Sequence, residues 1–127
     1  MMIALIDDDV EDIDFMGTAV KDNYPDCQCI TFTDCETALA ALVTTIPPPD
    51  YIFVDVNMNK TDGEQCLQDI RKISHLRESR IVMMSASMHI YEKGQRRFLD
   101  SGAFAIVEKP ESLDGYGKMF VDIIGHL

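Results

Sequence analysis

Five short apolar runs alternate with amphipathic segments along the 127 residues of this chain. Runs of this length are typical of strands buried on both faces, and the segments between them repeat apolar residues at helical spacing. Strands are therefore expected at residues 1–6, 27–32, 51–54, 81–84 and 104–107. Five β-α units with short connections predict one α/β domain over residues 1–127, in which helices cover both faces of a parallel sheet.

Helix start and stop signals support this division of the chain. Thr33 and Glu36 form a Thr-x-x-Glu pattern that predicts a capping box, and three prolines at 47–49 end the segment that follows. Gly102 is a candidate C′ residue after the fourth helical segment. Asp9 is expected to cap the first helix.

Charge and cysteine content narrow the classes of function. The chain has 22 acidic and 11 basic residues and a net charge of −11, which argues against binding nucleic acid or an anionic membrane. Four cysteines lack the spacing of a zinc site and are expected to be small buried residues outside any disulfide framework: Cys27, Cys29, Cys35 and Cys66. The apolar start has no basic region and is too short to span a membrane, so a cytoplasmic location is expected.

Acidic and polar side chains follow the predicted strands at their carboxyl ends. Asp7 and Asp8 follow the first strand, and Asp55 follows the third. In the strand order 2-1-3-4-5, the first and third strands are neighbours at the point where the winding reverses, which is where open parallel sheets bind ligands. Ser85 ends the fourth strand, and Lys109 comes just after the fifth. We expect all five side chains to lie at one edge.

Crowded carboxylates repel one another unless a cation joins them. Oxygen ligands without histidine or cysteine favour Mg2+ or Ca2+ over zinc, and a small site with open water positions favours Mg2+. Lys109 and Ser85 would add an ammonium and a hydroxyl beside Asp55, a combination that suits a phosphoryl group. Asp55 is then the candidate nucleophile.

These residues resemble the response-regulator receiver domains over nearly the whole chain. The resemblance is carried by residues 3–9, 51–63, 81–86 and 102–110, in that order. It implies a flavodoxin-like three-layer sandwich with a parallel five-stranded sheet of order 2-1-3-4-5. It also implies a stand-alone regulator, monomeric or weakly dimeric. A sensor histidine kinase or histidine phosphotransfer protein would donate the phosphoryl group, and a downstream protein would read the signal.

The resemblance also implies roles for individual residues. Asp55 would be the phosphoacceptor, Asp8 a direct Mg2+ ligand with Asp7 as its acidic partner, and Asn57 would supply a backbone carbonyl to the metal. Ser85 would be the switch hydroxyl, and Lys109 would pair with the phosphoryl group. Such a domain is not an ordinary enzyme, although spontaneous loss of its phosphoryl group is expected along a path flanked by residues 57 and 87.

Two positions depart from the family pattern. Asn59 stands where the family often has proline, so a less rigid loop is expected. Ile106 stands where the family commonly has tyrosine or phenylalanine, so the usual aromatic readout is missing. A shift of the face formed by the fourth helix, fifth strand and fifth helix would then depend on Ser85 alone.

Two other functions compete with this interpretation. Residues 6–9 resemble the Asp-x-Asp motif of haloacid-dehalogenase-like phosphatases, in which Asp7 would be the nucleophile. Alternatively, Ile106 is compatible with a receiver-fold binding module that works without phosphorylation. The histidines, which are His75, His89 and His126, are expected to serve surface or packing roles. Lys93, Arg96 and Arg97 form a small basic patch that is expected to be a solvated helix face, with partner docking as the alternative.

Overall fold

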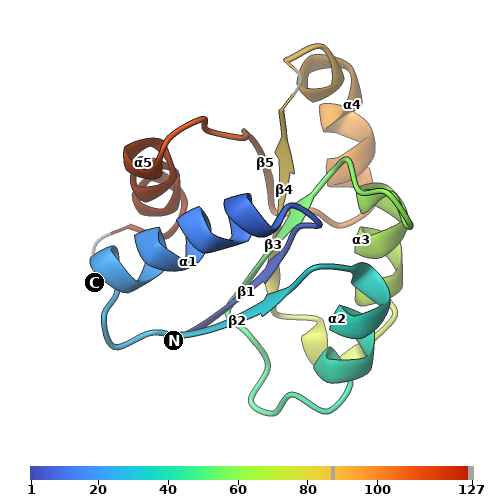
Figure 1. Ribbon diagram of the computed structural model, residues 1–127. Helices are drawn as coiled ribbons and strands as arrows, with labels where there is room; N and C mark the ends of the chain where they lie inside the picture. The colour runs from blue at the N-terminus through green and yellow to red at the C-terminus, as the bar shows by residue number, and fades with distance from the viewer. Residues whose placement is uncertain (87, 126–127) are drawn as a thin grey trace.

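A computed structural model of the protein describes residues 1–86 and 88–125, without the side chains of 88–93. Strands and helices alternate along the chain (Figure 1). The strands are β1 (Met2–Ile6), β2 (Gln28–Phe32), β3 (Tyr51–Asp55), β4 (Arg80–Ser85) and β5 (Ala105–Glu108). The helices are α1 (Val10–Asn23), α2 (Cys35–Leu42), α3 (Gly63–Arg71), the short 3-10 helix η1 (Ser74–Leu76), α4 (Met88–Asp100) and α5 (Leu113–Ile124).

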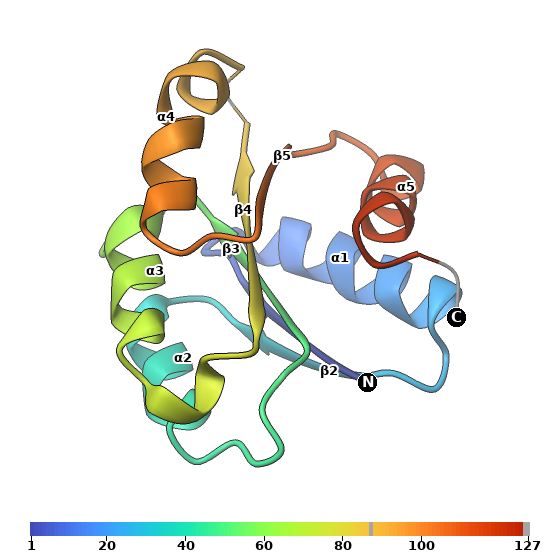
Figure 2. The same ribbon diagram turned by 180° about the vertical axis from the view of Figure 1, so that it is seen from behind.

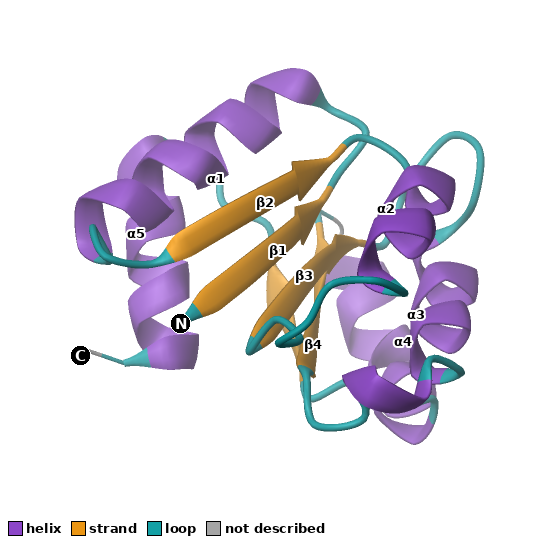
Figure 3. Ribbon diagram, turned by 90° about the horizontal axis from the view of Figure 1, so that it is seen from below, coloured by secondary structure: helices purple, strands orange, loops and turns teal. Residues whose placement is uncertain are grey.

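The five strands form one parallel sheet in the order β2-β1-β3-β4-β5. Helices α1 and α5 cover one face, and α2, α3 and α4 cover the other (Figures 1 and 3). Seen from behind, β4 and β5 lie between α4 and α5 (Figure 2). The flavodoxin-like order expected from the sequence is confirmed, and β1 and β3 are neighbours where the winding reverses.

Apolar clusters fill the space on each side of the sheet, which explains why the central strands are continuous apolar runs. All five residues of β3 are buried, and its four apolar side chains, at residues 51–54, alternate between the two clusters. On one face, Phe53 meets Phe120 of α5 edge to face at 4.8 Å between ring centroids. The edge strand β2 is only partly buried, in agreement with its more polar sequence.

The helix ends follow local chemistry, with one correction. Asp9 caps α1 as expected, since its side chain accepts the backbone N–H groups of Glu11 and Asp12. The capping box expected from Thr33 is wrong by one residue: Asp34 is the N-cap of α2 and accepts the Thr37 N–H at 2.7 Å. A carboxylate is a stronger cap than a threonine hydroxyl, and the chain stays extended through Asp34.

Gly102 terminates α4 in the manner the sequence indicated. It has a φ of +105°, a region that glycine enters without penalty. The Gly102 N–H donates to the Leu99 carbonyl, and the Ala103 N–H donates to the Phe98 carbonyl. These two bonds form a Schellman motif, which satisfies the last carbonyls of the helix and turns the chain into β5.

The start of α3 lies against the backbone at the end of β3, and this contact requires a glycine. The Gly63 N–H donates to the Val56 carbonyl at 2.9 Å. A Cβ on Gly63 would lie 2.6 Å from Val56 Cα and would also overlap the Asp55 carbonyl oxygen. The backbone that carries Asp55 is therefore packed directly beneath the first turn of α3.

Gly63→Ala is expected to lower the free energy of unfolding by about 2–3 kcal/mol, because rigid backbone must move to admit the methyl group. Gly17→Ala is the matched control: it lies within α1 with nothing within 4 Å of an added Cβ. That change should be neutral or stabilise the protein by up to about 1 kcal/mol. Urea unfolding measures both, and equal effects at the two glycines would contradict this account of the α3 contact.

Candidate functional site

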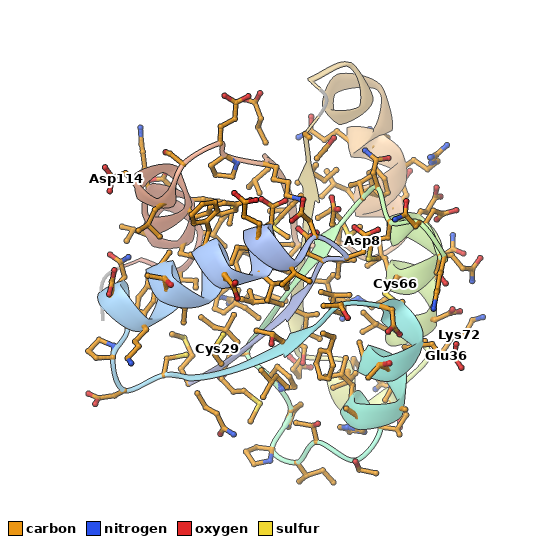
Figure 4. The ribbon with its side chains drawn as sticks, in the orientation of Figure 1. Asp8, Cys29, Glu36, Cys66, Lys72 and Asp114 are labelled. Carbon is orange, nitrogen blue, oxygen red and sulfur yellow. A yellow bond between two sulfur atoms is a disulfide. The ribbon has the colours of Figure 1, made fainter. Side chains whose placement is uncertain are left out.

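Three carboxylates meet at the carboxyl edge of the sheet. Asp7 and Asp8 follow β1, and Asp55 is the last residue of β3. Because β1 pairs with β3 in a register that joins Ile6 to Val54, Asp7 comes beside Asp55. One oxygen from each of Asp7, Asp8 and Asp55 lies within 4.8 Å of the others. Figure 4 shows Asp8 between the start of α1 and α3. This arrangement suits a divalent cation.

Backbone N–H groups of the surrounding loops orient these carboxylates. Asp7 Oδ1 accepts the Asp9 N–H at 2.9 Å, and Asp8 Oδ2 accepts the Asn59 N–H at 2.9 Å. Asp55 Oδ1 receives only a long bond of 3.4 Å from the Asn57 N–H. Asp7 is fully buried and Asp55 is 5% exposed, whereas Asp8 is partly exposed. Of the two buried acids, Asp55 is therefore the more exposed to solvent, and its side chain accepts the longer hydrogen bond.

Lys109 brings a positive charge to the same group. Its Nζ lies 2.7 Å from Asp7 Oδ2 and 3.6 Å from Asp55 Oδ2. Burial lowers the pKa of this ammonium, but the surrounding carboxylates outweigh burial and raise its pKa overall, so it remains charged. The Lys109 backbone N–H donates to the Ser85 carbonyl at 2.7 Å, which joins the end of β5 to the end of β4.

The electrostatics of Asp55 show how crowded the site is. Burial, followed by the Asp7 charge, raises the pKa of the Asp55 carboxyl to about 6 against the opposing charge of Lys109. Burial also raises the pKa of Asp7, against the hydrogen bond from Lys109. One lysine therefore does not compensate these acids fully, and a second positive charge would stabilise their ionised forms.

Ser85 and Ile106 lie where the strand pattern predicted. Ser85 is fully buried at the end of β4, one residue beyond Met84, which pairs with Asp55 across the sheet. Ile106 is 5% exposed and belongs to the apolar cluster on the α2, α3 and α4 face. An aliphatic side chain fixed in the core takes the place of the aromatic residue that the family commonly has.

Two residues of the site were missed from the sequence. Asp12 Oδ2 lies 2.7 Å from Lys109 Nζ, as close as Asp7. Tyr116 of α5 is fully buried, and after burial itself the Asp12 charge is the main cause that raises the pKa of its phenol. Asp12 lies in the first turn of α1, three residues after the Asp9 cap, and this nearness to the acidic end of β1 was the available signal.

The expectation that no cysteine forms a disulfide is wrong. Cys35 at the start of α2 and Cys66 in the first turn of α3 are bonded, with their Cα atoms 5.9 Å apart. Both are buried, and Figure 4 shows Cys66 on the side of α3 that faces α2. Packing of α2 beside α3 brings together residues separated by 31 positions, which no spacing motif reveals. Cys27 and Cys29 are free and partly buried.

The other residues singled out from the sequence take part in structural contacts, as far as their side chains are described. His75 Nε2 lies 2.9 Å from the Leu42 carbonyl, a packing role as expected. In the basic patch, Arg97 pairs with Glu64 at 2.8 Å and Arg96 with Asp100 at 3.5 Å. Residues 87 and 126 and the side chains of His89 and Lys93 lie outside the described part. Among the described helices, none is long and apolar enough to cross a membrane.

Comparison with known proteins identifies relatives of the chain. Residues 3–119 match the response regulator receiver domain. Protein PilG of Pseudomonas aeruginosa is 31% identical over 78 residues, which cover 61% of this chain and 56% of PilG. The match thus spans little more than half the length of that curated relative.

Solved structures share the fold. The phosphorylated cyanobacterial phytochrome response regulator RcpA has a TM-score of 0.82 at 24% identity, covering 96% of this chain and 89% of that one. The Mn2+-bound response regulator Rcp1 has a TM-score of 0.79 at 24% identity, covering 96% and 90%. The chemotaxis response regulator CheY4 of Vibrio cholerae has a TM-score of 0.81 at 20% identity, covering 97% and 98%. With the match over residues 3–119, this chain belongs to the response regulator receiver domain family.

Proposed function

We propose that Asp55 accepts a phosphoryl group from a sensor histidine kinase or a histidine phosphotransfer protein. Receiver domains are signalling domains that interact with kinases or downstream targets, and this one would signal through protein contacts or pass the group onward. The observation that carries the proposal is the group of three carboxylates with oxygens within 4.8 Å of one another, beside the charged Lys109.

The residues present fit Mg2+. The donors are all oxygens, which are the ligands that this hard cation prefers, and one of the three acids is partly exposed, so water positions stay open. Asp8, Asp55 and the backbone carbonyl of Asn57 would hold the ion, with Asp7 beside them. When bound, Mg2+ would neutralise the carboxylates and the charge on the oxygens of the incoming phosphoryl group.

The chain's own residues account for the transfer. An Asp55 carboxylate oxygen forms a bond to phosphorus while the bond from phosphorus to the donor's histidine nitrogen breaks, and the nitrogen keeps the electron pair. Lys109 remains protonated and pairs with a phosphoryl oxygen. The Ser85 hydroxyl donates to another, which gives β4 a means of responding to phosphorylation.

Asp7 is a poor alternative nucleophile. It has no exposed surface, its Oδ1 accepts the Asp9 N–H, and its Oδ2 lies 2.7 Å from Lys109 Nζ. The family match also disfavours the phosphatase interpretation, in which Asp7 would carry the phosphoryl group. A binding module that works unphosphorylated is the second candidate, because the aliphatic Ile106 is buried in the core. That candidate requires partner binding to survive Asp55→Asn.

Adduct formation with a small phosphodonor, followed by intact-mass measurement, tests the proposal. The wild-type chain should gain one phosphoryl group only when Mg2+ is present. Asp8→Asn should require at least about tenfold more Mg2+ for the same yield, because it removes a charged ligand. Asp14→Asn is the matched control, since Asp14 is exposed on α1 and loses the same charge. Equal yields with and without Mg2+ would count against the proposed metal site.

A further inference from the structure

The Lys109 ammonium lies at unequal distances from the carboxylates around it. Its ammonium lies 2.7 Å from both Asp7 and Asp12 but 3.6 Å from Asp55. Asp12 belongs to the first turn of α1 and stands outside the group of three acids that could hold a metal. Asp12 therefore competes with Asp55 for the Lys109 ammonium, although Asp12 is not a candidate metal ligand. The lysine side chain is only 11% exposed, so water screens this competition weakly.

Helix α5 brings a buried phenol within the electrostatic influence of Asp12. Tyr116 is fully buried, and its hydroxyl makes no well-formed hydrogen bond within the described residues. The Asp12 carboxylate acts on this phenol as well as on Lys109. Asp12 thus has the phenol of α5 and the lysine that follows β5 as neighbours, while its own backbone N–H is fixed by the Asp9 cap. The Asp12 carboxylate is therefore held by its ion pair with Lys109, and the Asp12 backbone is held by the Asp9 cap.

We propose that Asp12 is a positioning residue that draws the Lys109 ammonium away from Asp55 and so restrains phosphorylation. This inference rests on the proposed function of Asp55. A phosphoryl group on Asp55 needs the Lys109 ammonium as a counterion. Asp12 attracts that ammonium away from Asp55.

Removing the negative charge of Asp12 should make phosphorylation of Asp55 faster. At saturating Mg2+, Asp12→Asn is expected to form the phosphoryl adduct about three- to tenfold faster than wild type, a range set by one partly buried charge contact. Asp14→Asn removes an equal charge two residues along the same helix from an exposed position. It should keep the wild-type rate if the effect belongs to the Lys109 contact rather than to net charge.

An equilibrium measurement separates positioning of Lys109 from a change in folding. Beryllium trifluoride, a noncovalent mimic of the phosphoryl group, is titrated into the Mg2+-loaded protein. Asp12→Asn should bind it more tightly by the same three- to tenfold factor, which reflects the same charge contact. In a Lys109→Gln background, the Asp12 substitution should make no difference, because the ammonium that it positions is gone.

The outcomes are distinct. If wild type forms no adduct and does not bind the mimic, the proposed function of Asp55 fails. If wild type does both but Asp12→Asn matches Asp14→Asn, the positioning role is wrong while the proposed function stands. A full effect of Asp12→Asn in the Lys109→Gln background would also overturn the positioning role, since it would show an effect that bypasses the lysine.

Discussion

Asp55→Asn is expected to abolish the Mg2+-dependent phosphoryl adduct completely. The amide keeps the size of the side chain, but its nitrogen and carbonyl oxygen do not form a stable bond to phosphorus as a carboxylate does. No other acid in the group should take over, because Asp7 is fully buried beside Lys109 and Asp8 is held by the Asn59 N–H. Intact-mass measurement after treatment with a small phosphodonor checks this result.

The same variant should be well folded, which rules out loss of structure as the cause. The pKa of Asp55 is raised to about 6 from 3.8, so the fold favours its protonated form. The stability contributed by that preference is present at low pH and is lost as pH rises through about 6. In chelator at pH 8, Asp55→Asn should therefore be more stable than wild type by about 2–3 kcal/mol. The difference should shrink below about pH 4, and a destabilised variant at pH 8 would contradict this description of the site.

Reduction of the disulfide between Cys35 and Cys66 is expected to lower the free energy of unfolding by more than Gly63→Ala does. The bond joins residues 31 positions apart, and opening it restores conformational freedom to the unfolded chain. The expected cost is about 3–4 kcal/mol in the free energy of unfolding, or roughly 10 °C in Tm for a chain of this size. Thermal and urea unfolding with and without a dithiol reductant measure the effect.

The two free cysteines provide the control. A Cys27→Ala/Cys29→Ala double variant should keep its sensitivity to the reductant, whereas a Cys35→Ala/Cys66→Ala variant should lose it. Thiol titration of the unreduced, denatured wild-type chain should find the two free cysteines and no others. Four reactive thiols, or identical unfolding in both conditions, would show that the disulfide does not form.

The sheet could be predicted from the sequence because burial of its central strands determines which residues they contain. A strand buried on both faces requires apolar residues, as residues 51–54 of β3 show, and helices between such strands make the sheet parallel. The edge that gathers Asp7, Asp8, Asp55 and Lys109 follows from strand order without any knowledge of side-chain positions.

What the sequence did not reveal depends on contacts between distant segments. The bond from Cys35 to Cys66 requires the packing of α2 against α3, which has no local signature. The approach of Asp12 to Lys109 depends on how α1 lies relative to the end of β5. The cap of α2 moved from Thr33 to Asp34 because two adjacent residues could both serve, and only the backbone path distinguishes them.

Locating the phosphoryl group along the chain distinguishes Asp55 from the other acids as the phosphoacceptor. After treatment with a small phosphodonor and Mg2+, the adduct is mapped by tandem mass spectrometry of proteolytic fragments. We predict one modified residue, Asp55, which is the last residue of β3. Modification of Asp7, the nucleophile of the phosphatase alternative, or of any residue other than Asp55 would contradict it.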